Sequence, residues 1–440
     1  MDNVTHALAG LLLADGACVL AARRLGRHPS APLRATAALL GVVAAEFPDS
    51  DLIYSGPVVG MGKLGYLMHH RGHTHTVLWA LIGAALLWWL ADWWWRRRER
   101  ATAGAEASTA PDVAMARLVL PPIAVIGTLS HLVLDWTNSY GVHPFWPFDN
   151  RWFHGDAVFI VEPWFWVIAI PALVWAPRSP RGRRMLGICL ALILAASWGL
   201  GEVPTLLAGV LTASAALLLV LYRGLSDAQR VAGGVVCWLV VTLLFVSARN
   251  TAKAQVAATD PAHELRDVVL TPAPADPTCW EAITVSTDGV LYRVSSARVA
   301  PFPGLRSRSD CERAHVGRGV RGDPLANLPT STPVVPFDST SAAVQWHRSW
   351  TVPRAELVAL AAERCEFAVA LRFMRTPVWQ EYGTGTIVLS DARYGVGDGG
   401  FAEVEMPGVP GPCPLVGRWV PGWVPPRMDI IQGRTASLSR

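Results

Sequence analysis

Histidines and aspartates gather in three short stretches of the first 140 residues, where their spacing suits metal binding. HHRGHTHT, residues 69–76, holds four histidines; FPDSD, residues 47–51, holds two aspartates; and HLVLD, residues 131–135, places a carboxylate four residues after a histidine. Imidazole and carboxylate groups are the usual ligands of zinc and similar divalent metals. These residue types therefore predict a metal site, with His6 near the N-terminus as a further candidate.

Two of these stretches leave alternatives open. On a helix, His131 and Asp135 would point to one face. They could share a metal, or Asp135 could orient the imidazole, or the pair could tie two helices together by a hydrogen bond. Asp49 and Asp51, just past a proline, could bind one ion or bridge two. The alternative for this pair is a solvated helix end.

The histidine-rich stretch is more specific, because so many imidazoles at the start of an apolar segment are unusual as core residues. His70 and His75 are the preferred ligands, and His73 is a weaker candidate. Arg71 could hold a phosphate or carboxylate with two hydrogen bonds, or could pair with a nearby aspartate. Thr74 could orient a ligand or cap the following helix.

The composition indicates an integral membrane protein. Of 440 residues, 52% are hydrophobic and 16% are charged, against roughly 25% charged in a soluble domain. The chain has 20 tryptophans, which suit the membrane interface. It has no basic patch interleaved with aromatic residues, so we expect no nucleic-acid partner. The start, MDNVTHALAGLLLADG, lacks the positive region of a signal peptide and predicts a retained first helix.

Apolar stretches of helical length predict about eight transmembrane helices, with about 17–25 residues needed for a full span. They cover approximately residues 4–22, 33–47, 76–95, 117–135, 158–176, 185–201, 203–222 and 231–248. The second stretch is short, and only residues 201–204 separate the sixth from the seventh stretch. A count of seven would move the C-terminus to the other side of the membrane.

The distribution of arginine favours eight spans, because arginine and lysine concentrate in cytoplasmic loops. Clusters follow the first, third, fifth and seventh stretches: Arg23, Arg24, Arg27, Arg34; Arg96, Arg97, Arg98, Arg100; Arg178, Arg181, Arg183, Arg184; and Arg223, Arg230. The alternate loops hold only Lys63, Arg71 and Arg151. Both termini are then outside, and all the candidate ligands fall at one depth. That shared depth favours His6 as a ligand over an isolated core histidine.

The composition changes after about residue 250. We predict an all-α membrane domain at residues 1–250, a polar, proline-rich linker at 251–278, and an extracytoplasmic β-rich or α+β domain at 279–440. This last domain contains an even set of cysteines in what would be an oxidising compartment, which predicts one or two disulfides. They are Cys279, Cys311, Cys365 and Cys413.

The loop before the fifth apolar stretch contains further carboxylates. Asp156 and Glu162 flank the return into the membrane, and either could be a further ligand or the general base.

Together, MDNVTHALAG, FPDSD, HHRGHTHT and HLVLDWTNSYGVHPFWPF resemble the bacterial inner-membrane metal-dependent hydrolase family, described as LexA-binding, inner membrane-associated hydrolases. The resemblance covers about residues 1–165 and implies a membrane-bound hydrolase with a distant likeness to zinc-dependent phospholipase C. The family pattern falls on His6, Asp49, Asp51, His70, Arg71, Thr74, His75, His131 and Asp135, and its acidic residue before proline corresponds to Glu162.

We therefore expect a metal-dependent hydrolase at the outer face of the bacterial inner membrane. Its metal, zinc or alternatively manganese, would be held by His6, Asp49, His70, His75, His131 and Asp135. Asp51 or Glu162 would be the base, and Arg71 would neutralise a developing anion. The expected reaction is hydrolysis of a phosphoester in a lipid or another amphiphilic substrate.

Two other functions stay open. A non-enzymatic envelope protein would use a structural metal and bind a protein partner through its C-terminal domain. A metal held by four protein ligands would favour this function, whereas a metal with an open coordination position would favour catalysis. A transporter is less favoured, because its ion ligands should lie near mid-membrane rather than at helix ends.

Overall fold

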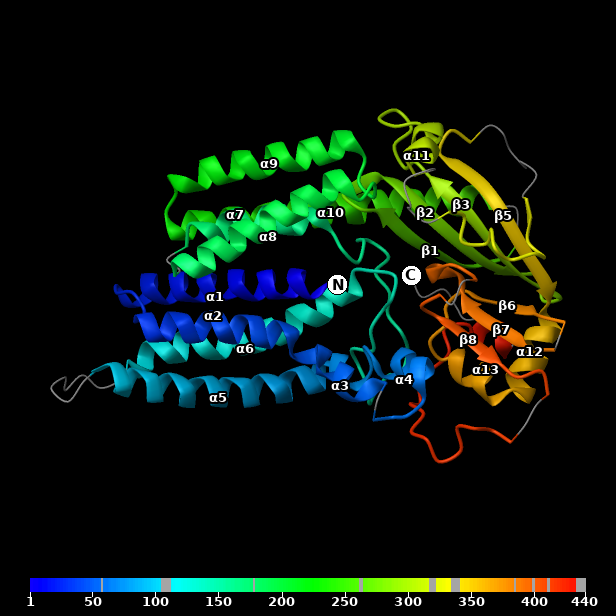
Figure 1. Ribbon diagram of the computed structural model, residues 1–440, viewed down its shortest axis with the longest axis horizontal. Helices are drawn as coiled ribbons and strands as arrows, with labels where there is room; N and C mark the ends of the chain where they lie inside the picture. The colour runs from blue at the N-terminus through cyan, green and yellow to red at the C-terminus, as the bar shows by residue number, and fades with distance from the viewer. Residues whose placement is uncertain are drawn as a thin grey trace. The chain divides into compact units, whose positions relative to one another are not determined.

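The computed structural model describes residues 1–56, 58–103, 112–176, 179–260, 264–315, 322–333, 341–383, 385–397, 400–409 and 412–432. The chain divides into two compact units (Figure 1). The helical unit comprises Met1–Ser50, His73–Trp146 and Phe159–Leu244, and the sheet unit comprises Asp51–Gly72, Pro147–Val158 and Phe245–Arg440. Arg178, one of the arginines used to predict the topology, lies outside the described residues.

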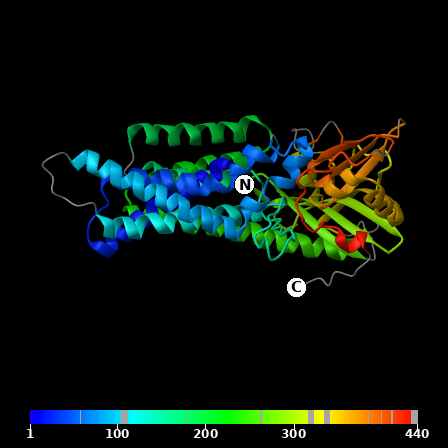
Figure 2. The same ribbon diagram turned by 90° about the horizontal axis from the view of Figure 1, so that it is seen from below.

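Each of the eight predicted apolar stretches contains a helix, and the helices of the helical unit lie side by side (Figures 1 and 2). They are α1 (Asn3–Leu25), α2 (Ala31–Glu46), α5 (Val77–Ala103), α6 (Val113–Trp136), α7 (Pro163–Val174), α8 (Pro180–Gly199), α9 (Thr205–Arg223) and α10 (Asp227–Thr259). Among the described residues, six helices are long and apolar enough to cross a membrane: α1, α5, α6, α8, α9 and α10. Because α2 has 16 residues and α7 has 12, the count of eight spans stays a prediction.

Local capping fixes where the first helices begin. The Asp2 side chain accepts hydrogen bonds from the backbone N–H of Thr5 at 2.9 Å and from its hydroxyl at 2.6 Å, which satisfies orphan donors of the first turn of α1. The helix ends at Gly26, whose φ of 67° is left-handed. Ser30 then caps α2, so the chain reverses within a few residues. The first cap places His6 in the first turns of α1.

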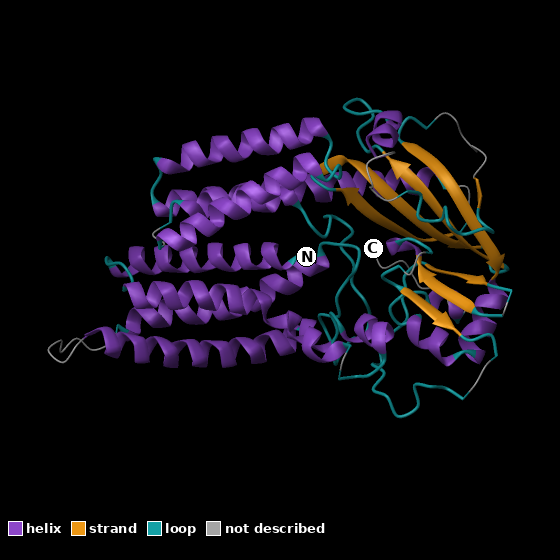
Figure 3. Cartoon of the chain, in the orientation of Figure 1, coloured by secondary structure: helices purple, strands orange, loops and turns teal. Residues whose placement is uncertain are grey.

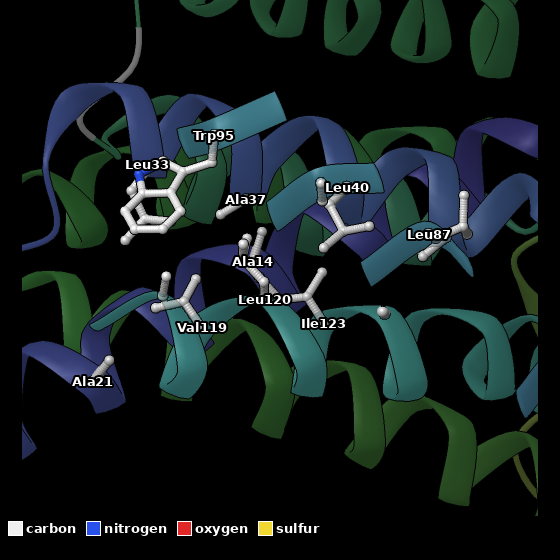
Figure 4. Close-up of a cluster of buried hydrophobic side chains, with 14 of the residues drawn as sticks. Ala14, Ala21, Leu33, Ala37, Leu40, Leu87, Trp95, Val119, Leu120 and Ile123 are labelled. Atoms are coloured by element: carbon white, nitrogen blue, oxygen red, sulfur yellow. The ribbon is translucent and has the colours of Figure 1, made fainter. Parts of the chain in front are cut away.

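The core of the helical unit is built from small and aliphatic residues of α1, α2, α5 and α6 (Figure 4). Gly10 of α1 and Gly41 of α2 bring the two backbones together, because a Cβ on Gly10 would lie 2.1 Å from the carbonyl oxygen of Gly41. A Cβ on Gly127 of α6 would lie 2.8 Å from the Cβ of Ala44. Small residues at helix contacts are the usual way in which membrane helices approach closely.

The described part of the sheet unit forms two antiparallel sheets, shown in orange in Figure 3. The larger has the strand order β1-β2-β3-β5-β4: β1 (Leu265–Ala273), β2 (Asp276–Thr287), β3 (Leu291–Val299), β4 (Thr332–Pro333) and β5 (Val344–Pro353). The smaller contains β6 (Pro377–Glu381), β7 (Ile387–Asp391) and β8 (Glu403–Met406). Short helices accompany them: α3 (Leu52–Ser55), α4 (Gly62–His69), α11 (Arg308–His315), α12 (Arg354–Glu363), α13 (Cys365–Ala370) and α14 (Met428–Ile431). The prediction of a sheet-rich C-terminal region is confirmed.

The cysteines of the sheet unit form two disulfides, Cys279–Cys311 and Cys365–Cys413. Their connectivity was not readable from the sequence. Of the stretch predicted as a linker, the structure places residues 251–259 in α10, residues 265–273 in β1 and residues 276–278 in β2.

A loop between α6 and α7 is built into the sheet unit. The Trp152 indole donates a 2.6 Å hydrogen bond to the carbonyl oxygen of Arg372, and Arg375 pairs with Asp156 at 2.7 Å and with Asp267 at 2.7 Å. Burial raises the pKa of Asp267, but Arg375 and Arg427 outweigh this effect and hold that pKa below its ordinary range. Removing one partner of such a buried network would leave a charge uncompensated.

The glycine contact between α1 and α2 generates a stability prediction. Gly10→Ala should lower the thermal unfolding midpoint in detergent, because overpacking against backbone costs about 1–3 kcal/mol. Gly16→Ala is the matched control, because its Cβ would meet only a side-chain methyl of Val231 at 3.4 Å. That control should be neutral or stabilising by up to about 1 kcal/mol, as for any glycine replaced within a helix. Equal midpoints for the two variants would contradict the close approach.

Candidate metal centre

Five predicted ligands meet in the helical unit, each from the end of an element. His6 lies in the first turns of α1, Asp49 lies in the short 3₁₀ helix Phe47–Asp51 after α2, and His75 ends the 3₁₀ helix His73–His75. His131 and Asp135 lie on the last two turns of α6. Their i, i+4 spacing puts both side chains on one face of α6, as the sequence predicted.

Four donor atoms of this group lie within 4.8 Å of one another, one each from Asp49, His75, His131 and Asp135. His75 Nε2 is 3.3 Å from Asp49 Oδ1 and 3.1 Å from Asp135 Oδ2. His131 Nε2 is 3.4 Å and 3.3 Å from the same two oxygens, and 3.1 Å from His75 Nε2. Ligands about 2.0–2.1 Å from a tetrahedral zinc are separated from one another by roughly 3.3 Å. The donor set therefore fits a divalent metal.

The imidazoles are oriented by hydrogen bonds on their other nitrogen. The backbone carbonyl oxygen of Ala45 is in hydrogen-bond contact with His131 Nδ1, which must be the donor because a carbonyl can only accept. In the neutral ring, this leaves the Nε2 lone pair of His131 directed at the group. His75 Nδ1 lies 3.1 Å from the Thr74 hydroxyl, a contact that would let Thr74 orient this imidazole. Such supporting bonds are typical of metal-binding histidines.

The centre is nearly closed to solvent. The side chains of His75 and His131 are 0% exposed, that of Asp135 is 1% exposed and that of Asp49 is 12% exposed. Burial raises the pKa of Asp49, but hydrogen bonds to His131 and His75 outweigh burial and hold that pKa below its ordinary range. The contacts with the two imidazoles therefore favour the ionised form of Asp49, which is the form that binds metal.

Other groups border the four donors. The ring of His6 stacks on that of His131, with centroids 3.8 Å apart, and His6 Nε2 lies 3.3 Å from Asp135 Oδ1. The N-terminal amino group of Met1 also contacts Asp135. Asn3 donates to Glu46 at 2.8 Å and approaches Asp49 at 3.5 Å.

Asn3 and the carbonyl group of Ala45 were missed by the reasoning from sequence. The position of Asn3, three residues before His6, was the available signal for that side chain. No side-chain pattern identifies a supporting backbone carbonyl.

Asp51, His70 and Arg71, three further predicted residues of FPDSD and HHRGHTHT, form a hydrogen-bonded group in the sheet unit. Asp51 Oδ1 is 3.0 Å from His70 Nδ1, and Asp51 Oδ2 accepts a 2.9 Å hydrogen bond from the backbone N–H of Arg71. Arg71 has a φ of 60° and is buried. A left-handed conformation is uncommon for a residue with a side chain. The Asp51 carboxylate thus joins the His70 ring to the backbone of Arg71.

Glu162 and His73 have other contacts. The buried Glu162 carboxylate caps α7 by accepting a hydrogen bond from the backbone N–H of Trp164 at 3.2 Å. The His73 ring packs edge-on against Trp146, with centroids 4.6 Å apart. Asp156, the other loop carboxylate considered from the sequence, pairs with Arg375 in the sheet unit.

The fold and this centre define a multi-pass membrane protein with a buried Asp/His cluster that could hold a metal ion. Residues 1–203 match the family model described as YdjM inner membrane protein. This part of the chain, which carries all five residues of the centre, is thus similar to an inner-membrane protein family. The match and the apolar helices together support a multi-pass inner-membrane protein. No curated protein and no solved structure matches the chain.

The left-handed backbone at Arg71 generates a second stability prediction. Arg71→Gly should unfold at a higher temperature than Arg71→Ala, because both lose the guanidinium but only alanine retains the steric cost of this conformation, about 1–2 kcal/mol. Thermal unfolding of the two variants in the same detergent measures the difference. A higher midpoint for the alanine variant would show that the left-handed turn is wrong.

Proposed function

We propose that the protein is a membrane-embedded, metal-dependent hydrolase that acts on a phosphoester of a lipid or another amphiphile. The observation that carries the metal part of the proposal is the set of four donor atoms from Asp49, His75, His131 and Asp135, which lie within 4.8 Å of one another. Catalysis would require the ion to accept water as a further ligand. Zinc is the proposed metal, because imidazole and carboxylate donors at these distances suit it.

Different residues of the chain would have different roles in the reaction. Asp49, His75, His131 and Asp135 would hold the metal, with His6 as a flanking or additional ligand. A divalent ion bound there would act as a Lewis acid and make water acidic enough to attack at neutral pH. The water oxygen would bond to phosphorus as the bond from phosphorus to the alcohol oxygen breaks. The water would lose one proton to a carboxylate, for which Asp51 and Glu162 are the candidates. The alcohol oxygen that leaves would gain a proton.

The group of Asp51, His70 and Arg71 has a proposed role on the substrate side. The two hydrogen bonds at Asp51 fix the His70 ring and the Arg71 backbone. We propose that the guanidinium of Arg71 neutralises the anion that develops on the phosphoryl group. From the sequence, His70 was predicted as a metal ligand, and this role stays a proposal.

We propose eight membrane crossings, for a reason independent of the arginine clusters. The sheet unit takes in residues 51–72, residues 147–158 and the chain after residue 245. If this unit lies on one side of the membrane, the chain crosses an even number of times between these segments. Because α8, α9 and α10 are candidate spans, α7 would be the fourth crossing.

The same reasoning applies to α1 and α2. His6 near the start of α1 and Asp49 just after α2 lie at one centre, so the two helices would form one pair of crossings. The 12 residues of α7 cover only roughly 18 Å, so flanking residues would extend that crossing. The two disulfides favour an oxidising compartment for the sheet unit, so the metal centre would face the outside.

This topology can be tested with reporter fusions in a bacterial host. Alkaline phosphatase, which is active only outside the cytoplasm, should be active when fused after residue 432 and inactive when fused after Leu225, in the turn between α9 and α10. Green fluorescent protein should give the reverse pattern. Phosphatase activity at Leu225 but not at residue 432 would place the sheet unit in the cytoplasm.

The metal centre itself is tested by elemental analysis of protein purified in detergent without chelators. About one equivalent of zinc is expected for the wild type, with loss of most of it in His75→Ala and His131→Ala, because each variant removes one of four donors. His73→Ala is the matched control from the same 3₁₀ helix and should retain the metal. Full metal content in all three variants would contradict the site.

A second function, a structural metal in a non-enzymatic envelope protein, is favoured by one observation: four protein donors can fill a tetrahedral site, and three of them are buried. Substituting cobalt and adding an anion such as azide separates the two functions. A change in the cobalt absorption spectrum would indicate an open position and favour catalysis. An unchanged spectrum, together with a lower unfolding midpoint after metal removal, would favour the structural function.

A further inference from the structure

An apolar groove of about 710 Å³ runs along the helical unit between α1, α6 and α10. Each helix contributes one face: Leu13 and Leu20 from α1, Ile126 and Val133 from α6, and Val235 and Trp238 from α10. The lining is almost entirely hydrocarbon. The hydroxyl of Ser130, the one hydroxyl group in the lining, donates to the carbonyl oxygen of Gly127 at 2.8 Å. The groove therefore suits a hydrocarbon chain and offers little to a polar group.

The groove is at least as long as one membrane leaflet. At about 1.5 Å per residue, its lining spans roughly 17 Å on α1, from Ala9 to Leu20, and roughly 24 Å on α6, from Leu118 to Leu134. The hydrocarbon core of a bilayer is about 30 Å thick, so one leaflet is about 15 Å. An acyl chain that spans one leaflet therefore fits lengthwise in the groove.

One end of the groove adjoins the metal centre along two helices. Ala9 lies three residues after His6 on α1, and Val133 and Leu134 lie between His131 and Asp135 on α6. Along α1 about one turn separates the groove lining from His6, and along α6 the lining reaches the level of His131 and Asp135. The Trp238 side chain is held in place on one side of the groove, because its ring stacks on Phe165 with centroids 4.5 Å apart.

We infer that this groove holds an acyl chain of a phospholipid, whose phosphoester end is thereby directed toward the metal centre. The inference rests on the proposed function for the reaction, but binding of the chain can be observed without it. Lipid would enter sideways from the leaflet nearest the centre. Burial of several methylene groups would contribute most of the affinity, at about 0.8 kcal/mol for each group.

The test uses a matched pair of substitutions at neighbouring positions of α6. Ile126→Trp fills the groove, whereas Val125→Trp adds the same ring at a position that is 37% exposed and outside the groove lining. Each protein is reconstituted in vesicles of phosphatidylethanolamine and phosphatidylglycerol with a trace of phosphatidylglycerol that carries a diazirine in one acyl chain. After illumination, cross-linked peptides are mapped by mass spectrometry, and bound metal is measured in the same samples.

Wild type and Val125→Trp should cross-link mainly at the groove faces of α1, α6 and α10. Ile126→Trp should reduce this labelling by about an order of magnitude, because the added ring removes burial of several methylene groups. Equal labelling of the groove in all three proteins, or labelling spread evenly over the lipid-facing helices, would overturn the inference. If the groove is labelled as expected but the wild type binds no metal, the proposed hydrolase function is contradicted, whereas the lipid site is supported.

Discussion

The structure depends on two carboxylates and two facing imidazoles that meet in a place closed to water. Asp49 and Asp135 bring negative charge into this space, and the Nε2 atoms of His75 and His131 lie 3.1 Å apart. Two lone pairs at that distance repel unless a proton or a metal cation lies between them. Because the four groups come from three parts of the chain, a cation at this point would tie the end of α2, α6 and the start of α5 together. Metal binding and packing of the helical unit would then be coupled.

That meeting point is reached only because α1, α2 and α6 approach closely. Gly10 against Gly41, and Gly127 against Ala44, remove the side chains that would keep the helices apart. These contacts lie within one or two turns of His6, Asp49 and His131. A shift of one helix by an ångström would separate donor atoms that are now 3.1–3.4 Å apart. The small residues of the core therefore help to set the geometry of the centre.

Much of this could be predicted from the sequence, because it rests on local periodicity. The eight apolar stretches, the shared face of His131 and Asp135, and the sheet-rich C-terminal region follow from spacing alone. Other features depend on long-range contacts that leave no local pattern. The Ala45 carbonyl group that orients His131, the pairing of Asp51 with His70, and the Asp156–Arg375 ion pair belong to this kind. Arg71 was recognised by its charge, but its left-handed backbone could not be recognised.

The set of chain segments that forms the sheet unit changes how the C-terminal region is understood. The sequence indicated a domain attached after the last helix, yet this unit also includes residues 51–72 and 147–158, which connect helices of the other unit. Trp152 and Asp156 are held by hydrogen bonds to Arg372 and Arg375, so the C-terminal chain completes a structure that the loops begin. The loop that carries Asp51, His70 and Arg71 belongs to the same unit. Folding of the C-terminal chain should therefore determine how rigidly that group is held.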